Sequence, residues 1–335
     1  MRTPLPISLA ALALSTAAAP LPGPAYHDAE SIAVPDGSWD YARVDPDTHR
    51  LYVARAAFVT VVDLAAANAV RTIGAVERGH AVVPLPGGTL LVTSGNDATV
   101  RFLDTASGKE LARIAVGKKP DAAIYDAASG LAYVMNATDG SVSILDVAAM
   151  RVVDTIQLKP GLEYAAIGKD GALYVNDEDT NEIEVADLKH GGTAGTIALP
   201  GCEEPSGLAY DAKRNVLISA CANGKAAIVD VTHRKMTGLV DIGAGPDAVI
   251  LDAERRLAFI PCGKDGVLDI LSLDAPGGVK RVARVKTEVG ARTGALDSAT
   301  GAIYLPSAKF APPAKPGERP AAIPGTAHVL VVRPS

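Results

Sequence analysis

Aromatic residues are scarce in this 335-residue chain. They make up 4% of the residues and include one tryptophan, whereas hydrophobic residues make up 48%, so any core must be built mainly from Val, Ile, Leu and Ala. Basic runs are also missing, because the net charge is −6 and the densest basic stretches are Lys118-Lys119 and a loose group at 280–286. This composition argues against a dedicated nucleic-acid binder, which normally carries a strong basic surface.

Several sequence signatures of catalysis are absent as well. The chain has no Cys-x-x-Cys-His, His-Glu-x-x-His or Gly-x-Ser-x-Gly motif and no phosphate-binding glycine loop, and its six histidines are dispersed without ligand spacing. We therefore assign no catalytic residue, cofactor or metal ligand from motifs. The acidic segment 177–181 begins like a calcium loop but lacks glycine at the sixth place and glutamate at the twelfth, so we expect a solvated loop.

Long apolar stretches are confined to the N-terminus. Residues 1–25 combine an early Arg2, a short apolar segment at 7–14 and the small residues of 15–19, a pattern typical of a secretory signal peptide. A disordered tail is the alternative. No later stretch is long and apolar enough for a membrane span of about 20 residues. We therefore expect a periplasmic or secreted protein whose mature part begins near residue 26.

Two markers repeat through the rest of the chain with the same period. An aspartate that closes a predicted strand recurs at steps of 41, 42, 41, 43 and 42, counted to the equivalent Ser272. An aromatic or leucine residue in the preceding strand recurs seven times, from Tyr52 to Tyr304. Each unit has room for four short strands with alternating side chains, as in Ser141-Val142-Ser143-Ile144. A four-stranded repeat of this length predicts an all-β fold, a seven-bladed β-propeller over residues 26–335.

The two ends of the chain are expected to close the ring. The seventh unit supplies only three strands, and the fourth-strand period leads upstream to Ile32. Pairing this N-terminal segment with the last unit would complete blade seven and remove two exposed sheet edges. A proline-rich insertion at 306–325 interrupts blade seven. It is either a lid over the channel or a tolerated surface loop.

Propellers open onto one face of their channel where each first strand begins and where the second strand turns into the third. The residues at these positions have polar side chains of both signs and include the single tryptophan. They are Trp39, Asp40, Arg55, His80, Asn96, Asp121, Asn136, Glu163, Tyr164, Asn176, Asp177, Glu203, Glu204, Asp247, Lys264 and Arg292. A solvated channel mouth would have a similar composition, but convergent polar groups in a concavity favour a site.

From this set we predict a ligand site in the funnel. Its residues are Trp39, Arg55, His80, Asn96, Asp121, Asn136, Glu163, Glu204, Asp247 and Arg292. Such a site suits a small anionic or zwitterionic molecule, because Arg292 and Arg55 can hold a carboxylate while Asp121 or Glu204 meets a positive group.

The three cysteines cannot all be paired within one chain. Cys202 precedes the first strand of blade five and Cys221 ends the second, so antiparallel pairing brings them close and a disulfide is expected in an exported protein. Cys262 occupies the place of Cys221 one blade later. A Cys221–Cys262 bond is therefore the alternative, and otherwise Cys262 is a buried core residue.

With these residues described, the chain resembles the YncE-like family of YVTN-type β-propeller repeat proteins. The matching segments are residues 50–54, 95–100, 116–122, 202–209 and 290–297, and the resemblance extends from about residue 29 to 332. It implies an exported seven-bladed propeller, in most members without an established activity. Related propellers belong to quinoprotein or nitrous-oxide reductase systems, others are lactonases, and DNA binding occurs in one branch.

Two functions compete at this point. The first is a monomeric exported protein that binds a small ligand or a protein partner at its funnel. The second is a lactonase-like hydrolase with a metal held by Asp121, Glu163, Glu204 or Asp247, or an accessory protein of a periplasmic redox system. Because Arg292 and Lys118 would oppose a cation, we favour binding over catalysis.

Overall fold

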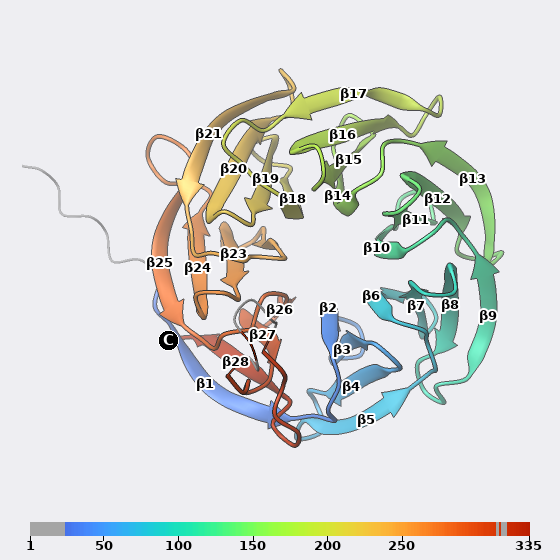
Figure 1. Ribbon diagram of the computed structural model, residues 1–335, viewed down its shortest axis with the longest axis vertical. Coiled ribbons are helices and arrows are strands. Elements are labelled where there is room, and N and C mark those ends of the chain that lie inside the picture. The colour runs from blue at the N-terminus through green and yellow to red at the C-terminus, as the bar shows by residue number, and fades with distance from the viewer. Residues whose placement is uncertain (1–23, 313–314, 316–319) are drawn as a thin grey trace, which may run out of the picture.

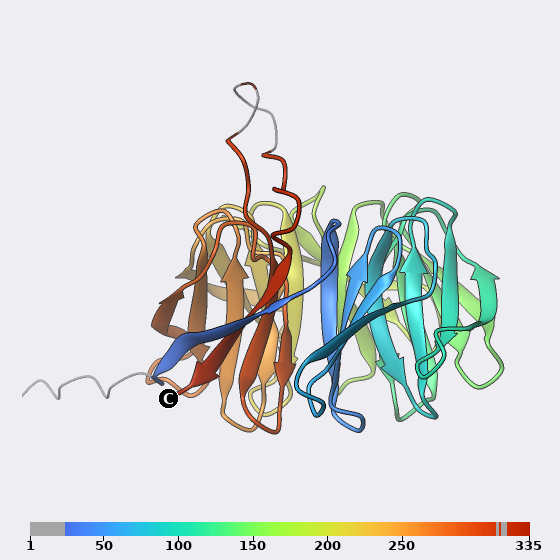
Figure 2. The same cartoon turned by 90° about the horizontal axis from the view of Figure 1, so that it is seen from below.

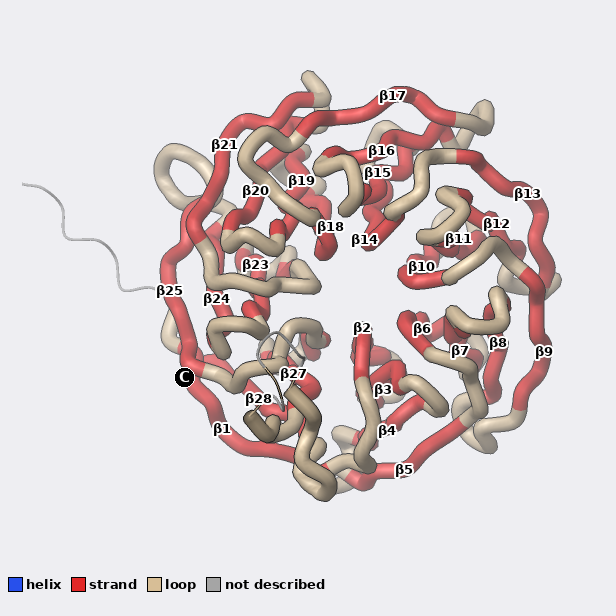
Figure 3. Tube along the Cα trace, viewed as in Figure 1, coloured by secondary structure: helices blue, strands red, loops and turns tan. Residues whose placement is uncertain are grey.

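The computed structural model describes residues 24–312, 315 and 320–335, so the predicted signal peptide lies almost entirely outside the described residues. Every helix or strand element assigned in the described residues is a β-strand (Figure 3). The strands form seven four-stranded antiparallel sheets, which stand as blades around a central axis (Figure 1). The predicted seven-bladed propeller is confirmed. In this part of the chain no helix could span a bilayer.

Blades one to six each use four consecutive strands, ordered from the channel outward. Blade one contains β2 (Trp39–Asp45), β3 (Arg50–Arg55), β4 (Val59–Asp63) and β5 (Ala69–Ile73). Blade two contains β6 (Gly79–Leu85), β7 (Thr89–Ser94), β8 (Thr99–Asp104) and β9 (Glu110–Ala115). Blade three contains β10 (Pro120–Asp126), β11 (Leu131–Asn136), β12 (Ser141–Asp146) and β13 (Arg151–Gln157).

The second half of the ring repeats this order. Blade four contains β14 (Leu162–Ile167), β15 (Ala172–Asp177), β16 (Glu182–Asp187) and β17 (Thr193–Ala198). Blade five contains β18 (Pro205–Asp211), β19 (Val216–Cys221), β20 (Lys225–Asp230) and β21 (Lys235–Asp241). Blade six contains β22 (Ile250–Asp252), β23 (Leu257–Cys262), β24 (Val267–Ser272) and β25 (Lys280–Lys286).

Blade seven joins the two ends of the chain. It contains β26 (Ala295–Asp297), β27 (Ala302–Ser307), β28 (His328–Pro334) and, outermost, β1 (Tyr26–Ala33). The β1 strand pairs antiparallel with β28, and the buried Ile32 lies opposite Val329. Tyr26 also packs edge-on against Phe259 of blade six, with ring centroids 5.1 Å apart. The predicted closure by the N-terminal strand is therefore confirmed.

Local sequence explains why the first two strands of a blade form a hairpin. An aspartate ends the inner strand, and its carboxylate accepts a hydrogen bond from the backbone N–H two residues later, at 3.0 Å for Asp45 and 3.1 Å for Asp126. Asp211 and Asp297 repeat this contact in blades five and seven. Such side-chain caps stabilise tight turns, so the repeating aspartates fix the hairpin that begins each of these blades.

The proline-rich insertion leaves blade seven between β27 and β28 and stands above one face of the ring (Figure 2). Its described base is a short ladder, because the Ala311 N–H donates to the Ala321 carbonyl at 2.9 Å and Phe310 pairs with Ala322. A backbone N–H of Gly325 donates to Asp36 at 2.6 Å, which ties this base to the segment that enters blade one. The insertion therefore presents Phe310 in a fixed place near the channel mouth.

The cysteines pair as the sequence favours. Cys202 and Cys221 form a disulfide with their Cα atoms 5.3 Å apart, and Cys262 is unpaired and buried. Burial, together with the charge of Asp269, raises the pKa of the Cys262 thiol to about 12. This thiol is therefore protonated and inert in the folded protein.

Candidate functional site

One residue from each blade reaches the channel at the same structural position. In blades one to five this residue follows the first paired residue of the inner strand, where the pairing register shifts and a bulge interrupts the ladder. A bulge redirects side chains away from the regular alternation. The seven residues are Asp40, His80, Asp121, Glu163, Ser206, Asp247 and Arg292, which we call the channel ring.

A histidine between two carboxylates forms one side of the channel ring. The Nδ1 atom of His80 lies 2.7 Å from Asp40 Oδ2 and 3.1 Å from Asp121 Oδ1, so blades one, two and three meet at this side chain. Lys119 adds a second positive group, with its Nζ 3.0 Å from Asp121 Oδ2. Burial alone would lower the pKa of His80, but its hydrogen bonds to Asp121 and Asp40 outweigh burial and raise that pKa to about 9. The imidazole is therefore charged at neutral pH.

On the other side of Asp40, blades seven and six add an arginine and an acid to the channel ring. The Arg292 Nε donates to Asp247 at 2.6 Å, and the Arg292 side chain remains 46% exposed. Burial and the charge of Asp40 raise the pKa of Asp247 to about 6, although Arg292 opposes this shift. Burial, then the charges of Asp121 and Asp247, raise the pKa of Glu163 well above its usual value. Glu163 therefore holds its proton more strongly than an exposed glutamate does.

Two tyrosines close the channel at the level of the bulges. Tyr41 of blade one and Tyr164 of blade four have ring centroids 4.9 Å apart, and the Tyr41 hydroxyl faces Glu163 Oε2 at 3.5 Å. The guanidinium of Arg43 lies 5.3 Å from the Tyr164 ring centre. Because these side chains meet across the channel, a ligand entering from the face of the insertion would stop at the channel ring.

A cavity of about 360 Å³ opens beside the ring between blades seven, one and two. Trp39 and Phe310 supply aromatic walls, with ring centroids 6.2 Å apart, and the buried Trp39 Nε1 has no hydrogen-bond partner. Arg78, His80 and Arg292 supply positive groups around the same space, and Asp40 supplies a carboxylate. We call this space the aromatic cavity.

Two neighbouring cavities share residues with the aromatic cavity. One, of about 410 Å³, is lined by Asn96 and Lys119 and shares Arg78 and His80. The other, of about 540 Å³, is lined by Glu204 and Asp247 and shares Arg292 and Phe310. Together the three form an arc around the channel mouth, with the aromatic cavity in the middle.

The structure places two of the predicted site residues away from the three cavities. The Arg55 side chain is buried and donates to the carbonyl oxygens of Pro35, Gly37 and Ser38 at 2.6 to 3.0 Å, so it supports the segment that enters blade one. Asn136 is fully buried inside blade three. Its Nδ2 donates to Ser141 Oγ at 3.0 Å and Ser143 Oγ at 2.9 Å. Neither side chain lines the three cavities.

Six of the remaining predicted residues line one or more of the three cavities: Trp39, His80, Asn96, Glu204, Asp247 and Arg292. Asp121 and Glu163 belong to the channel ring beside these cavities. The prediction omitted Arg78, Phe310 and Lys119, and in blade five it chose Glu204 where Ser206 occupies the ring position. Lys119 lies two residues before the ring residue Asp121 and was detectable from the repeat. Phe310 lies in the insertion, which has no counterpart in other blades.

The ability to hold a metal also differs from the prediction. In the described part of the chain, the group near the channel that could ligate an ion is Asp40, His80 and Asp121, whereas Asp121, Glu163, Glu204 and Asp247 do not gather into one set. Both carboxylates of that group already face the His80 Nδ1, and Lys119 contacts Asp121. The adjoining positive charge opposes a second cation.

Comparison with known proteins supports the fold. No protein-family model matches the chain, and no curated protein matches its sequence. The chain is similar in structure to Kuenenia stuttgartiensis hydrazine synthase, with 16% identity over 88% of this chain and 96% of the other and a TM-score of 0.68. It is also similar to a chain of the mitotic checkpoint complex, with 16% identity over 99% and 98% and a TM-score of 0.71. At this identity the likeness shows the propeller fold alone.

Proposed function

We propose that this chain is an exported propeller of the YncE-like type that binds a small carboxylate-bearing molecule in the aromatic cavity. The observation that carries the proposal is the placement of Trp39 and Phe310 beside Arg78 and Arg292 around one space of about 360 Å³. Small-molecule sites combine apolar walls with a few converging polar groups in this way, and their volumes begin near 300 Å³.

Each part of the cavity suits a different part of such a ligand. The planar guanidinium groups of Arg78 and Arg292 match a carboxylate and can bind it through two hydrogen bonds. A flat apolar group would stack on Trp39 and Phe310. Asp40 also lines the space and would meet an amine, so amino acids and related zwitterions belong to the proposed class.

Export and family are part of the proposal and have separate support. The Cys202–Cys221 disulfide fits a protein that matures in an oxidising compartment. The N-terminal pattern of residues 1–25 fits a secretory signal. The seven blades agree with the number that the resemblance to YVTN-type repeats implies.

A metal-dependent hydrolase is the weaker alternative, because the four carboxylates expected to hold its metal do not gather. A protein partner is the other alternative, since the insertion stands above one face of the ring (Figure 2) and its Phe310 lines the cavity. Assays of lactone hydrolysis with added zinc, manganese or calcium would separate the first alternative from simple binding.

The proposal is tested by a thermal-shift screen of the purified mature protein. Benzoate, phenylacetate, phenylalanine and aliphatic carboxylates are suitable probes, and Trp39 fluorescence reports on those that bind because it is the single tryptophan. Losing a charged hydrogen bond costs about 1.5–3 kcal/mol, so Arg292→Ala should weaken binding by about 10- to 100-fold.

The matched control is Arg113→Ala, because Arg113 is an exposed arginine on the outer strand of blade two. It should leave both ligand affinity and Tm unchanged. The proposal fails if no carboxylate changes Tm or fluorescence, or if Arg292→Ala binds each probe as tightly as the wild type.

A further inference from the structure

Three carboxylates meet on one face of blade four, away from the aromatic cavity. Asp177 ends β15 and lies opposite Glu182, the first residue of β16, and Glu184 follows two residues later on the same face. One oxygen from each lies within 4.8 Å of the others. Two ligands of one calcium ion, each about 2.4 Å from it, are at most about 5 Å apart, so this spacing fits a shared cation.

Burial makes this cluster different from ordinary surface acids. The Asp177 side chain is 0% exposed and that of Glu184 is 2% exposed. Asp177 Oδ1 accepts the backbone N–H groups of Asp179 and Thr180 at 3.1 and 3.0 Å, whereas its Oδ2 is buried without any hydrogen-bond partner. The sequence predicted a solvated loop at 177–181, and this prediction is wrong for Asp177. Its turn holds one carboxylate oxygen inside the blade without a hydrogen-bond partner.

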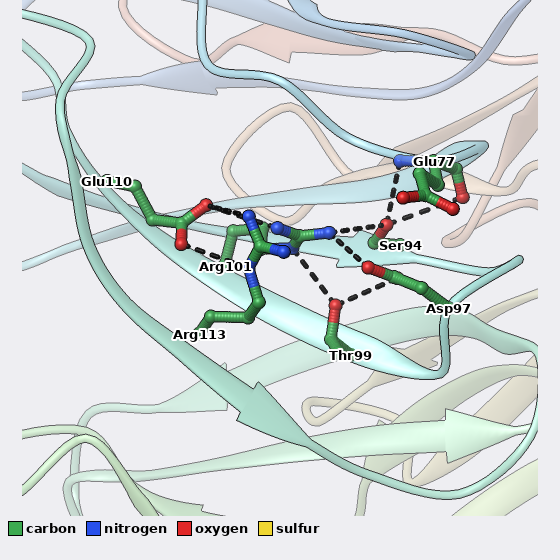
Figure 4. A network of polar contacts seen from close by, with 7 residues as sticks. All are labelled: Glu77, Ser94, Asp97, Thr99, Arg101, Glu110 and Arg113. Carbon is green, nitrogen blue, oxygen red and sulfur yellow. Dashed lines mark hydrogen bonds and ion pairs between the residues drawn. The ribbon is translucent and has the colours of Figure 1, made fainter.

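Blade two shows how the same positions are filled when no cation is needed. There Arg101 occupies the place of Glu184. Arg101 lies opposite Val92, the fourth residue of β7, and Glu184 lies opposite Val175, the fourth residue of β15. Figure 4 shows the Arg101 guanidinium held by Asp97, Thr99 and Glu110, so its buried charge is matched by acids.

Blade four has less compensating charge. One cation, Lys159, contacts the cluster, with its Nζ close to Glu182 Oε1 and 3.2 Å from Glu184 Oε1. The Lys159 side chain is 50% exposed, so it enters from solvent and can withdraw. Three carboxylates and one ammonium leave a deficit of two positive charges, which is the charge of one divalent ion. Burying unmatched carboxylates is costly, and metal coordination is a common way to offset that cost.

We propose that Asp177, Glu182 and Glu184 form a structural calcium site in blade four. Hard oxygen ligands alone, with no histidine or cysteine among them, suit calcium or magnesium rather than zinc or copper. Calcium is favoured because carboxylates on two strands offer flexible, bidentate coordination, whereas magnesium requires near-ideal octahedral geometry. Bidentate binding by the acids and added water would supply the 6–8 oxygens that calcium takes.

The experiment compares the chelator-treated mature protein with and without CaCl2, by calorimetric titration and by Tm. Wild type should bind one calcium ion and gain about 5 °C in Tm at a calcium concentration about 100 times Kd. Glu184→Gln should weaken calcium binding at least about 10-fold and raise the Tm of the calcium-free protein, because it removes a repelling charge. Lys159→Met should tighten calcium binding and lower the Tm of the calcium-free protein.

The matched control is Glu110→Gln, which alters a carboxylate of the Arg101 network in blade two and should leave calcium binding unchanged. The proposal is overturned if about 10 mM CaCl2, a concentration above the weakest protein sites, produces neither heat nor a Tm shift in wild type. It is also overturned if Glu184→Gln keeps wild-type calcium affinity, or if magnesium raises Tm as much as calcium at equal concentration.

Discussion

Removing the charged histidine of the channel ring should change how stability depends on pH. The His80 pKa is raised to about 9 by its contacts with Asp121 and Asp40. A histidine whose pKa is higher in the folded than in the unfolded protein stabilises the fold fully below the unfolded pKa of about 6.5, and this contribution is lost as pH rises through about 9. The shift of about 2.5 pKa units corresponds to about 3 kcal/mol.

The assay is urea unfolding of wild type and His80→Gln between about pH 6 and pH 9.5, a range chosen around the two pKa values. Over this range wild type should lose about 3 kcal/mol more unfolding free energy than the variant, since glutamine does not titrate. The control is His233→Gln, because His233 also contacts an aspartate but is 75% exposed, and its pH profile should match that of wild type. Parallel profiles for wild type and His80→Gln would refute the proposed charge state of the ring.

Three further predictions concern the architecture. Deleting residues 26–33 removes β1 and the buried Ile32, and the loss of Ile32 alone should lower the free energy of unfolding by about 2–5 kcal/mol. Tm should fall, and the exposed edge of β28 should promote association. A truncated monomer that melts like wild type would contradict ring closure. Replacing Cys202 and Cys221 together by alanine opens a loop with a sequence separation of 19 and should cost about 3 kcal/mol of unfolding free energy. In the wild type, a thiol reagent should label no cysteine until denaturant exposes Cys262, and rapid labelling of the native protein would show that the pairing is wrong.

The fold was predictable because its signals are local and recur in every blade. Six of the seven hairpin turns carry an aspartate, as at Asp45 and Asp126, whereas blade two has Pro86-Gly87-Gly88, and each strand alternates its side chains. The period also led from the last blade back to Ile32, since a ring must pair its first strand with its last. Because the unit repeats along the chain, the sequence shows the pattern of the four-stranded blade several times, and each repeat supports the same prediction.

The site was only partly predictable, for a physical reason that Arg55 and Asn136 illustrate. Both end the second strand of a blade, and the second strands β3 and β11 are buried on both faces. Sequence alternation then tells which residues share a face but not which face meets the channel. His80 and Asp121 were chosen because the start of the inner strand recurs at one period, whereas the place of Phe310 depends on how the insertion docks.

The most direct test of ligand binding in the aromatic cavity is the indole signal of Trp39. Protein labelled with ¹⁵N-tryptophan has a single indole N–H resonance, because the chain has one tryptophan. Titration with the tightest carboxylate from the screen should shift this resonance along a one-site curve, and Arg292→Ala should move the midpoint to a concentration about 10- to 100-fold higher. A resonance that stays in place while calorimetry reports binding of the same compound would place the ligand elsewhere and contradict the proposed function.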